Sequence, residues 1–176
     1  MKRVAIRTDS SNAIGTGHVI RCLTLAKALK ARGSEVAFVC RAHPGNLIEF
    51  LTRCGFEVVT LPEPKAREDY QDPQAPDSYL DWLGVTPDQD AQETFEGLSK
   101  ISRNWDLTVV DHYALGRDWE LSARKWSQKL MVVDDLANRE HVADLLLDQN
   151  VFENPFTTIV RSRIPSILIR LICSPS

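Results

Sequence analysis

The sequence contains no apolar run long enough to cross a membrane and no leader of the secretory type. Its 176 residues include only short apolar stretches, whereas a membrane helix needs about 20 consecutive apolar residues. The basic start, residues 1–3, is followed by three apolar residues before charge returns at Arg7, which is too short for a signal peptide. We therefore expect a cytoplasmic protein without a membrane partner.

Excess positive charge and paired cysteines are also absent. The formal net charge is −3, so the composition offers no basic surface for nucleic acid or an acidic membrane. The four cysteines are scattered and form no C-x-x-C pair, which predicts reduced, mostly buried thiols. They are Cys22, Cys40, Cys54 and Cys173. With 43% apolar residues, the chain can form one full globular domain with a core.

The glycine pair Gly15-Thr16-Gly17 lacks what the common nucleotide motifs require. Ile20 stands where a dinucleotide fingerprint has its third glycine or an alanine. A Walker A lysine is missing, and so are H-E-x-x-H and any tight Asp/His spacing for a metal ion. We therefore expect neither NAD nor a metal, and no cofactor.

Strand-like and helix-like segments alternate along the chain. Apolar runs predict strands at 4–6, 35–40, 56–61, 107–110, 130–133 and 143–147, and helical spacing predicts helices at 18–32, 46–51, 90–103 and 118–127. Short turns between strand, helix and strand imply parallel pairing. The predicted fold is α/β, an open doubly wound, Rossmann-like and mostly parallel sheet of five or six strands with helices on both faces. Residues 62–77, with four prolines, are expected to form a surface loop.

The last part of the chain differs in composition. Residues 154–176 contain no acidic residue, while three arginines are spread among Ile, Leu, Pro and Ser. We therefore divide the chain into an α/β domain at 1–150 and an atypical tail at 151–176. The tail is either a truncated or frame-shifted end, which the composition favours, or an amphipathic segment.

Polar side chains follow the predicted strands at the edge where parallel strands end. Ligands of open α/β sheets bind at that edge, so we expect the site there. The residues are Asp9, Gly15, Gly17 and His18 after the first strand, Arg41 and His43 after the second, Asp111, His112 and Tyr113 after 107–110, and Asp134 and Asp135 after 130–133.

His18 stands where a Gly-rich turn runs into a helix. The two glycines let the backbone approach a ligand, and the helix N-terminus offers unpaired N–H groups with partial positive charge. That charge disfavours an imidazolium, so we expect a neutral ring able to accept a proton near pH 7. Arg21, one turn later, either neutralises an anionic ligand or is simply solvated. In the purely structural interpretation, Asp9 and Asp111 cap turns and Tyr113 belongs to the core.

A set of short segments carries a further signal: residues 7–9, 14–18, 21–26, 82–85, 110–113, 133–137 and 145–150. In these segments and in their order along the chain, up to about residue 150, the sequence resembles the UDP-2,4-diacetamido-2,4,6-trideoxy-β-L-altropyranose hydrolase family.

The resemblance implies one half of a two-domain GT-B fold, like that of the MurG enzyme. It implies hydrolysis of the UDP-sugar at the anomeric carbon with inversion and without a metal, in pseudaminic acid biosynthesis and so in flagellin glycosylation. His18 then corresponds to the family's proposed base. The residues implied to line the substrate cleft are Asp9, Gly15, Gly17, Arg21, Asp111, His112 and Tyr113.

The resemblance also implies a second domain that supplies most UDP contacts. That domain has no counterpart in this sequence and would be the natural docking partner, so we expect this chain alone to be weakly active or inactive. Two alternatives remain. One is the N-terminal acceptor domain of a GT-B glycosyltransferase, with His18 activating an acceptor hydroxyl, and the other is a non-catalytic ligand-binding module.

Overall fold

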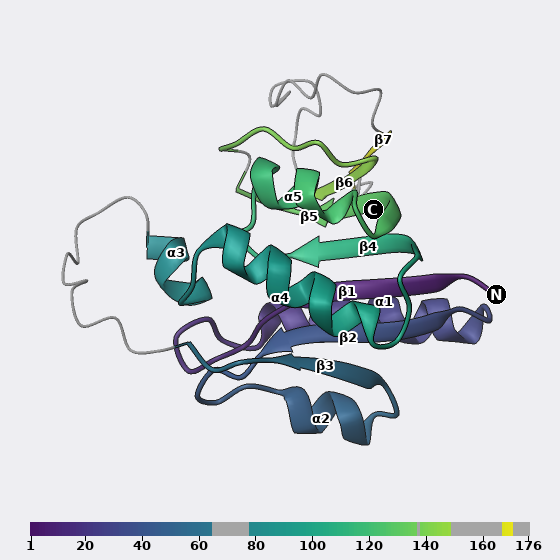
Figure 1. Ribbon diagram of the computed structural model, residues 1–176, viewed down its shortest axis with the longest axis horizontal. Helices are drawn as coiled ribbons and strands as arrows, with labels where there is room; N and C mark the ends of the chain where they lie inside the picture. Colours follow the sequence, from purple (N-terminus) through teal and green to yellow (C-terminus); the bar gives the residue numbers. More distant parts are fainter. Residues whose placement is uncertain (65–77, 137, 149–166, 171–176) are drawn as a thin grey trace, which may run out of the picture.

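The computed structural model describes residues 1–64, 78–136, 138–148 and 167–170 (Figure 1). Strands and helices alternate along most of the chain. The strands are β1 (Arg3–Thr8), β2 (Glu35–Arg41), β3 (Glu57–Leu61), β4 (Trp105–Asp111), β5 (Ser127–Val133), β6 (Leu145–Asp148) and β7 (Ile167–Arg170). The helices are α1 (Gly17–Ala31), α2 (Ile48–Arg53), α3 (Ser78–Leu83), α4 (Pro87–Ser99) and α5 (Arg117–Ala123).

The strands form one parallel sheet in the order β3-β2-β1-β4-β5-β6-β7. β1 lies between β2 and β4, and its Ile6 is in register with Phe38 of β2 and Val109 of β4. The strand order changes direction between β1 and β4, and ligands of open α/β sheets bind outside the carboxyl edge at such a point. The predicted α/β fold with a parallel sheet is confirmed, with seven strands rather than five or six.

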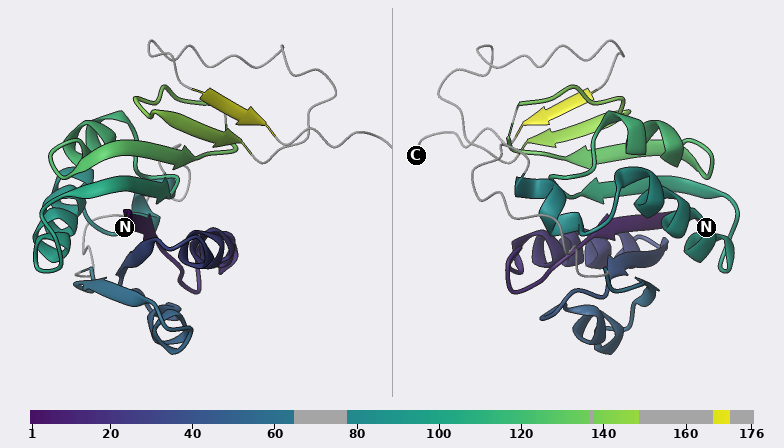
Figure 2. Two further views of the ribbon diagram at one scale, coloured as in Figure 1. Left: turned by 90° about the vertical axis from the view of Figure 1, so that its right-hand side faces the viewer. Right: turned by 60° about the vertical axis from the view of Figure 1, so that its left-hand side comes forward.

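Helices cover both faces of the sheet, because strand residues alternate between them. Val4 and Ile6 pack with Val19 and Leu23 of α1 in one apolar cluster. Ala5 lies on the opposite face, in the cluster that contains Trp119 of α5 and residues of α4. The left view of Figure 2 shows α1 and α2 on one side of the sheet and α4 and α5 on the other. No described helix combines the length and apolarity needed to span a membrane.

Several elements differ from the sequence prediction. The helix predicted over 90–103 is α4 (Pro87–Ser99), which begins and ends earlier than expected. α5 ends at Ala123, and β5 begins at Ser127, so the helix predicted over 118–127 was too long at its C-terminal end. α3 was not predicted, and neither was β7, which pairs with β6 although it lies in the segment predicted to be an atypical tail. Most of the predicted loop 62–77 and most of 151–176 lie outside the described residues, so the division at 150 stays a prediction. Of the cysteines that the structure describes, Cys22 and Cys40 are buried and none forms a disulfide.

Candidate functional site

The loop between β1 and α1 forms one side of the candidate site. The Ser11 hydroxyl oxygen accepts the backbone N–H of Ile14 (2.9 Å), and the Ser11 carbonyl accepts the N–H of Gly15 (2.9 Å). Gly15 has a φ of +78°, a conformation that favours glycine. A Cβ at Gly15 or Gly17 would meet no described atom within 4 Å, so the space beside both glycines is open.

His18 is oriented by Asp111, which ends β4. His18 Nδ1 lies 2.7 Å from Asp111 Oδ1. An ionised carboxylate only accepts hydrogen bonds, so a proton on Nδ1 satisfies this contact, and Arg21 Nη2 lies 3.2 Å from the same nitrogen. The side chain of His18 is 10% exposed and that of Asp111 is fully buried. The carboxylate therefore fixes the orientation of the His18 ring.

Arg21 and Cys22 complete the environment of the Asp111 carboxylate. Arg21 donates from Nε to Oδ2 and from Nη2 to Oδ1, both at 2.5 Å, and the Cys22 thiol lies 3.4 Å from Oδ2. Burial alone raises the pKa of Asp111, but the hydrogen bonds from Arg21 and His18 outweigh it and hold the pKa below its usual range. Arg21 is thus an ion-pair partner inside the site.

Tyr113 packs against His18. The edge-to-face ring pair has a centroid distance of 4.7 Å, and the Tyr113 hydroxyl donates to Asp135 Oδ1 at 2.5 Å. Burial, followed by the contact with Asp135, raises the pKa of Tyr113 to about 12. The phenol therefore stays protonated at neutral pH, and Asp135, which also lies 3.5 Å from Arg21 Nη1, joins the site.

Two further aromatic side chains surround Tyr113 from α3. Tyr79 lies 5.1 Å from Tyr113 between ring centroids, and Trp82 lies 6.0 Å away. Both rings are half-buried. The site therefore has an aromatic wall beside His18, which the sequence analysis did not identify.

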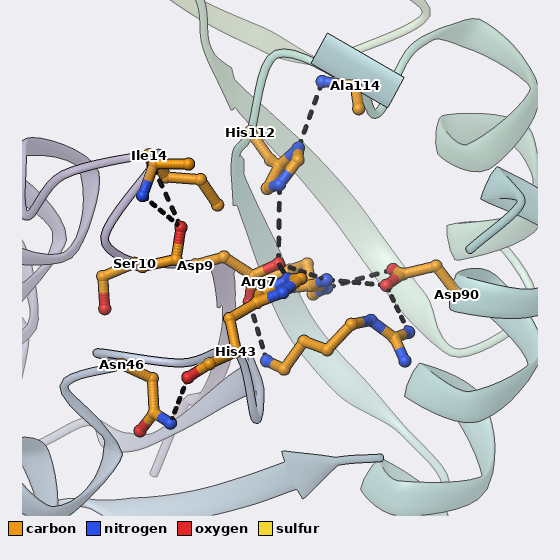
Figure 3. Close-up of polar contacts among 12 residues, drawn as sticks. Arg7, Asp9, Ser10, Ile14, His43, Asn46, Asp90, His112 and Ala114 are labelled. Atoms are coloured by element: carbon orange, nitrogen blue, oxygen red, sulfur yellow. Dashed lines mark hydrogen bonds and ion pairs between the residues drawn. The ribbon is translucent and has the colours of Figure 1, made fainter. Parts of the chain in front are cut away.

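A buried network of charges lies under the same edge of the sheet (Figure 3). Arg7 donates to both oxygens of Asp9 (2.6 and 2.8 Å) and to both oxygens of Asp90 (3.0 and 2.6 Å). Arg41 Nη2 donates to Asp90 Oδ2 at 2.7 Å. Each of these four side chains is at most 1% exposed. Arg41 Nη2 also pairs with the partly exposed Glu93 at 2.7 Å, so each of the four buried ions has an oppositely charged partner, as buried ions require.

Asp9 and His112 belong to this network and not to the open rim. His112 Nδ1 accepts the backbone N–H of Ala114 (3.1 Å), and its Nε2 lies 3.4 Å from Asp9 Oδ2 (Figure 3). Burial lowers the pKa of His112 to about 4, so the ring is neutral at pH 7. His43 Nε2 approaches the same Asp9 oxygen at 3.7 Å.

The structure thus sorts the predicted site residues into two groups. One group lies together beside the glycine loop and consists of His18, Arg21, Asp111 and Tyr113. The other group, Asp9 and His112, belongs to the buried network of charges. Sequence reasoning placed Asp135 at the rim but not among the substrate contacts. It missed Asp90 and Tyr79, which no motif marks, and it did not place Trp82 in the site although Trp82 lies in the matching segment 82–85. Across the residues that the structure describes, no group of three or more His, Cys, Asp or Glu side chains could hold a metal ion.

Comparison with known proteins gives one informative similarity. A search against models of protein families finds none that matches this chain. The chain is 26% identical over 178 residues to the UDP-2,4-diacetamido-2,4,6-trideoxy-beta-L-altropyranose hydrolase of Campylobacter jejuni subsp. jejuni serotype O:2. The alignment includes 96% of this chain, so it extends past residue 150, and it covers 52% of the relative. The chain therefore spans about half the length of this relative.

Proposed function

We propose that this chain carries the water-activating half of a UDP-sugar hydrolase, with His18 as general base. The observation that carries the proposal is the hydrogen bond from His18 Nδ1 to Asp111 Oδ1 at 2.7 Å, at the point where the strand order changes direction. The printed name of the Campylobacter relative supports the same class of reaction. Its substrate, a UDP-linked diacetamido-trideoxy sugar, is the one we propose here.

The proposed reaction is a single displacement at the anomeric carbon. His18 Nε2 takes a proton from a water molecule while the water oxygen forms a bond to C1 of the sugar. The bond between C1 and the diphosphate oxygen breaks on the opposite face, UDP leaves with the electron pair, and the configuration inverts. The negative charge of Asp111 stabilises the positive charge that the ring gains in this step, as the carboxylate does in other Asp–His pairs.

The remaining side chains position the sugar and the base. The open space beside Gly15 and Gly17 admits the substrate to the N-terminus of α1, whose Thr16 makes no side-chain cap. Tyr113 and its aromatic neighbours offer an apolar wall for the sugar ring. Asp9 and His112 act indirectly, by supporting the loops above them. Contacts to the UDP group are proposed to come from a second domain, so this chain alone binds substrate weakly.

The test is UDP release under single-turnover conditions, with the chain in excess over UDP-2,4-diacetamido-2,4,6-trideoxy-β-L-altropyranose, in water labelled with heavy oxygen. We expect slow release of UDP, with the label in the C1 hydroxyl of the sugar and none in the phosphates. His18→Gln, which keeps a polar side chain of similar size without the base, should reduce release to the background rate. Label in a phosphate, or equal release by the variant, contradicts the proposal.

The same assay separates the two alternative functions. If free acceptor sugars are converted to glycosides faster than the UDP-sugar is hydrolysed, the chain is the acceptor domain of a glycosyltransferase. If the chain binds the UDP-sugar with unchanged affinity after His18→Gln and releases no UDP in either form, it is a non-catalytic binding module. Either result replaces the hydrolase proposal.

A further inference from the structure

A second group of buried charges adjoins the site, where the chain passes from β5 to β6. The imidazole of His141 lies between two carboxylates. Its Nδ1 is 2.6 Å from Glu120 Oε1 on α5, and its Nε2 is 3.1 Å from Asp134 Oδ2 after β5. Glu120 is fully buried, Asp134 is 4% exposed and His141 is 6% exposed. A ring that faces two carboxylates is fully paired only when both of its nitrogens carry protons.

This group fixes the connection between β5 and β6 in several places. Glu120 Oε2 accepts the backbone N–H of Val142 at 2.6 Å. Arg139 Nη2 pairs with Asp134 Oδ2 at 2.7 Å, and Arg139 Nη1 donates to the backbone carbonyl of Tyr113. Two cations, His141 and Arg139, therefore balance two carboxylates. The backbone is held on both sides of the turn that follows β5.

That turn carries Asp135, which connects the buried group to the site. Asp134 Oδ1 accepts the N–H of Leu136 at 2.8 Å, so the peptide unit that follows Asp135 is tied to the Asp134 side chain. The Asp135 carboxylate then accepts the hydroxyl of Tyr113, whose ring edge packs on His18. A continuous series of contacts thus runs from α5 to the proposed base.

We propose that His141, in its protonated form, is a positioning residue for His18. It holds Asp134 against Glu120, keeps Asp135 at the hydroxyl of Tyr113, and so fixes the Tyr113 ring beside the imidazole of His18. Its importance for catalysis rests on the proposed function, whereas the coupling between the two histidines does not. No bond is made or broken in this role.

The electrostatics of the buried group agree with this geometry. Burial alone lowers the pKa of His141, but the hydrogen bonds to Asp134 and Glu120 outweigh it and raise the pKa to about 9. At neutral pH both ring nitrogens therefore donate. Above that pKa one nitrogen loses its proton and faces a carboxylate oxygen with a lone pair, which weakens the attachment of the connection.

The first experiment uses the unaltered chain with ¹⁵N-labelled histidine and follows all four imidazoles by NMR as the pH rises. We expect the His141 ring to carry protons on both nitrogens at neutral pH and to lose one with a midpoint near pH 9. The ring signals of His18 should shift with the same midpoint, because Tyr113 moves relative to them. A His141 that is singly protonated at pH 7, or His18 signals without this inflection, would overturn the proposal.

The second experiment uses His141→Gln, which keeps a hydrogen-bonding side chain but removes the charge and one donor. Leu98→Ala is the control, because Leu98 is a fully buried apolar residue of α4 that takes no part in the hydrogen bonds of the charged group. At a temperature where both variants are folded, His141→Gln should shift the His18 signals and lower single-turnover UDP release roughly 10- to 100-fold. Leu98→Ala should lose thermal stability without either effect.

The two readouts separate this inference from the proposed function. If the chain releases no UDP but the His18 signals follow His141, the positioning role stands and the hydrolase proposal fails. If UDP release depends on His18 while His141→Gln and Leu98→Ala leave its signals equally unchanged, the positioning role is refuted. Asp135→Asn, which breaks the series at its next member, should reproduce the His18 shift of His141→Gln and provides the same test if that variant does not fold.

Discussion

At the residue scale, the Asp111 carboxylate orients the neighbouring side chains of the candidate site. It accepts hydrogen bonds from His18, Arg21 and Cys22 within one buried position at the end of β4. Removing its charge while keeping its shape should release the His18 ring to the other tautomer. The proton would then occupy Nε2, the nitrogen that the proposed mechanism needs to accept a proton from water.

We therefore expect Asp111→Asn to lower UDP release by about 10²- to 10⁴-fold, the range that loss of a base-orienting carboxylate produces elsewhere. Asp106→Asn is the matched control, since Asp106 makes an ion pair with the exposed Lys2 and lies at the start of the same strand. Circular dichroism should show that both variants keep the fold. An Asp111→Asn variant as fast as the control would mean that His18 does not depend on this carboxylate.

Individual site residues were predicted unequally from the sequence. His18 and Tyr113 stand in motifs that directly follow strands, and this context was enough to propose them. Asp90 gave no such signal, because it lies in the first turn of a helix rich in acidic residues, and only the folded structure shows that two arginines reach it. A solvated and a buried aspartate look the same in one sequence.

At the element scale, α4 lies close enough to β3 that one helix position must lack a side chain. A Cβ on Gly97 would come within 2.3 Å of Val59 Cγ1. Gly97→Ala should therefore destabilise the protein by about 1–3 kcal/mol, although alanine is the better helix former. Gln92→Ala, on the exposed side of the same helix, should change the free energy of unfolding by less than about 0.5 kcal/mol. Chemical denaturation measures both, and a stabilised Gly97→Ala variant would contradict the packing.

The connection from β5 to β6 should make stability depend on pH. The pKa of His141 is raised in the folded state to about 9, so its contribution is complete below the ordinary value of about 6.5 and is lost as the pH rises from there to about 9. The difference in unfolding free energy between the unaltered chain and His141→Gln should shrink by roughly 2–3 kcal/mol over this window. A difference that stays constant across these pH values would show that His141 is not charged in the folded protein.

Element boundaries were predictable where apolar periodicity was strong. The central strands and α1 follow from their apolar patterns, and the Gly33 stop agrees with the observed end of α1. α3 is too short for helical spacing to appear and follows a proline-rich stretch. β7 was missed because its segment was judged by composition, while its place in the sheet depends on pairing with the distant β6. Pairing partners far apart in sequence cannot be seen in a local pattern.

At the scale of the whole molecule, the buried ions at the carboxyl edge join the central strands to α4. Asp90→Ala leaves Arg7 and Arg41 without a shared partner in a dry environment, and we expect a loss of about 3–5 kcal/mol in stability. Asp88→Ala removes an exposed carboxylate from the same helical turn and should cost no more than about 1 kcal/mol. Thermal and denaturant unfolding of Asp90→Ala and Asp88→Ala measures both changes. Similar losses of unfolding free energy in the two variants would show that the buried network does not stabilise the protein.

The architecture could be predicted further than the site. Alternating strands and helices imply a parallel sheet, and a parallel sheet implies that its carboxyl edge binds ligands. Which polar residues at that edge face the crevice, and which lie under it, is decided by side-chain pairing between strands and helices. Asp9 illustrates this, since its position after β1 suggested a ligand contact while Arg7, two residues before it, holds it in the interior.

The four buried ions also constrain which substitutions the sequence can accept during evolution. They are Arg7, Asp9, Asp90 and Arg41. Replacing Arg7 or Asp90 removes a direct partner from two of the other three buried ions, so we expect the four positions to change together. We expect related sequences to keep all four ionic residues or to replace all four with apolar side chains, with intermediate combinations missing.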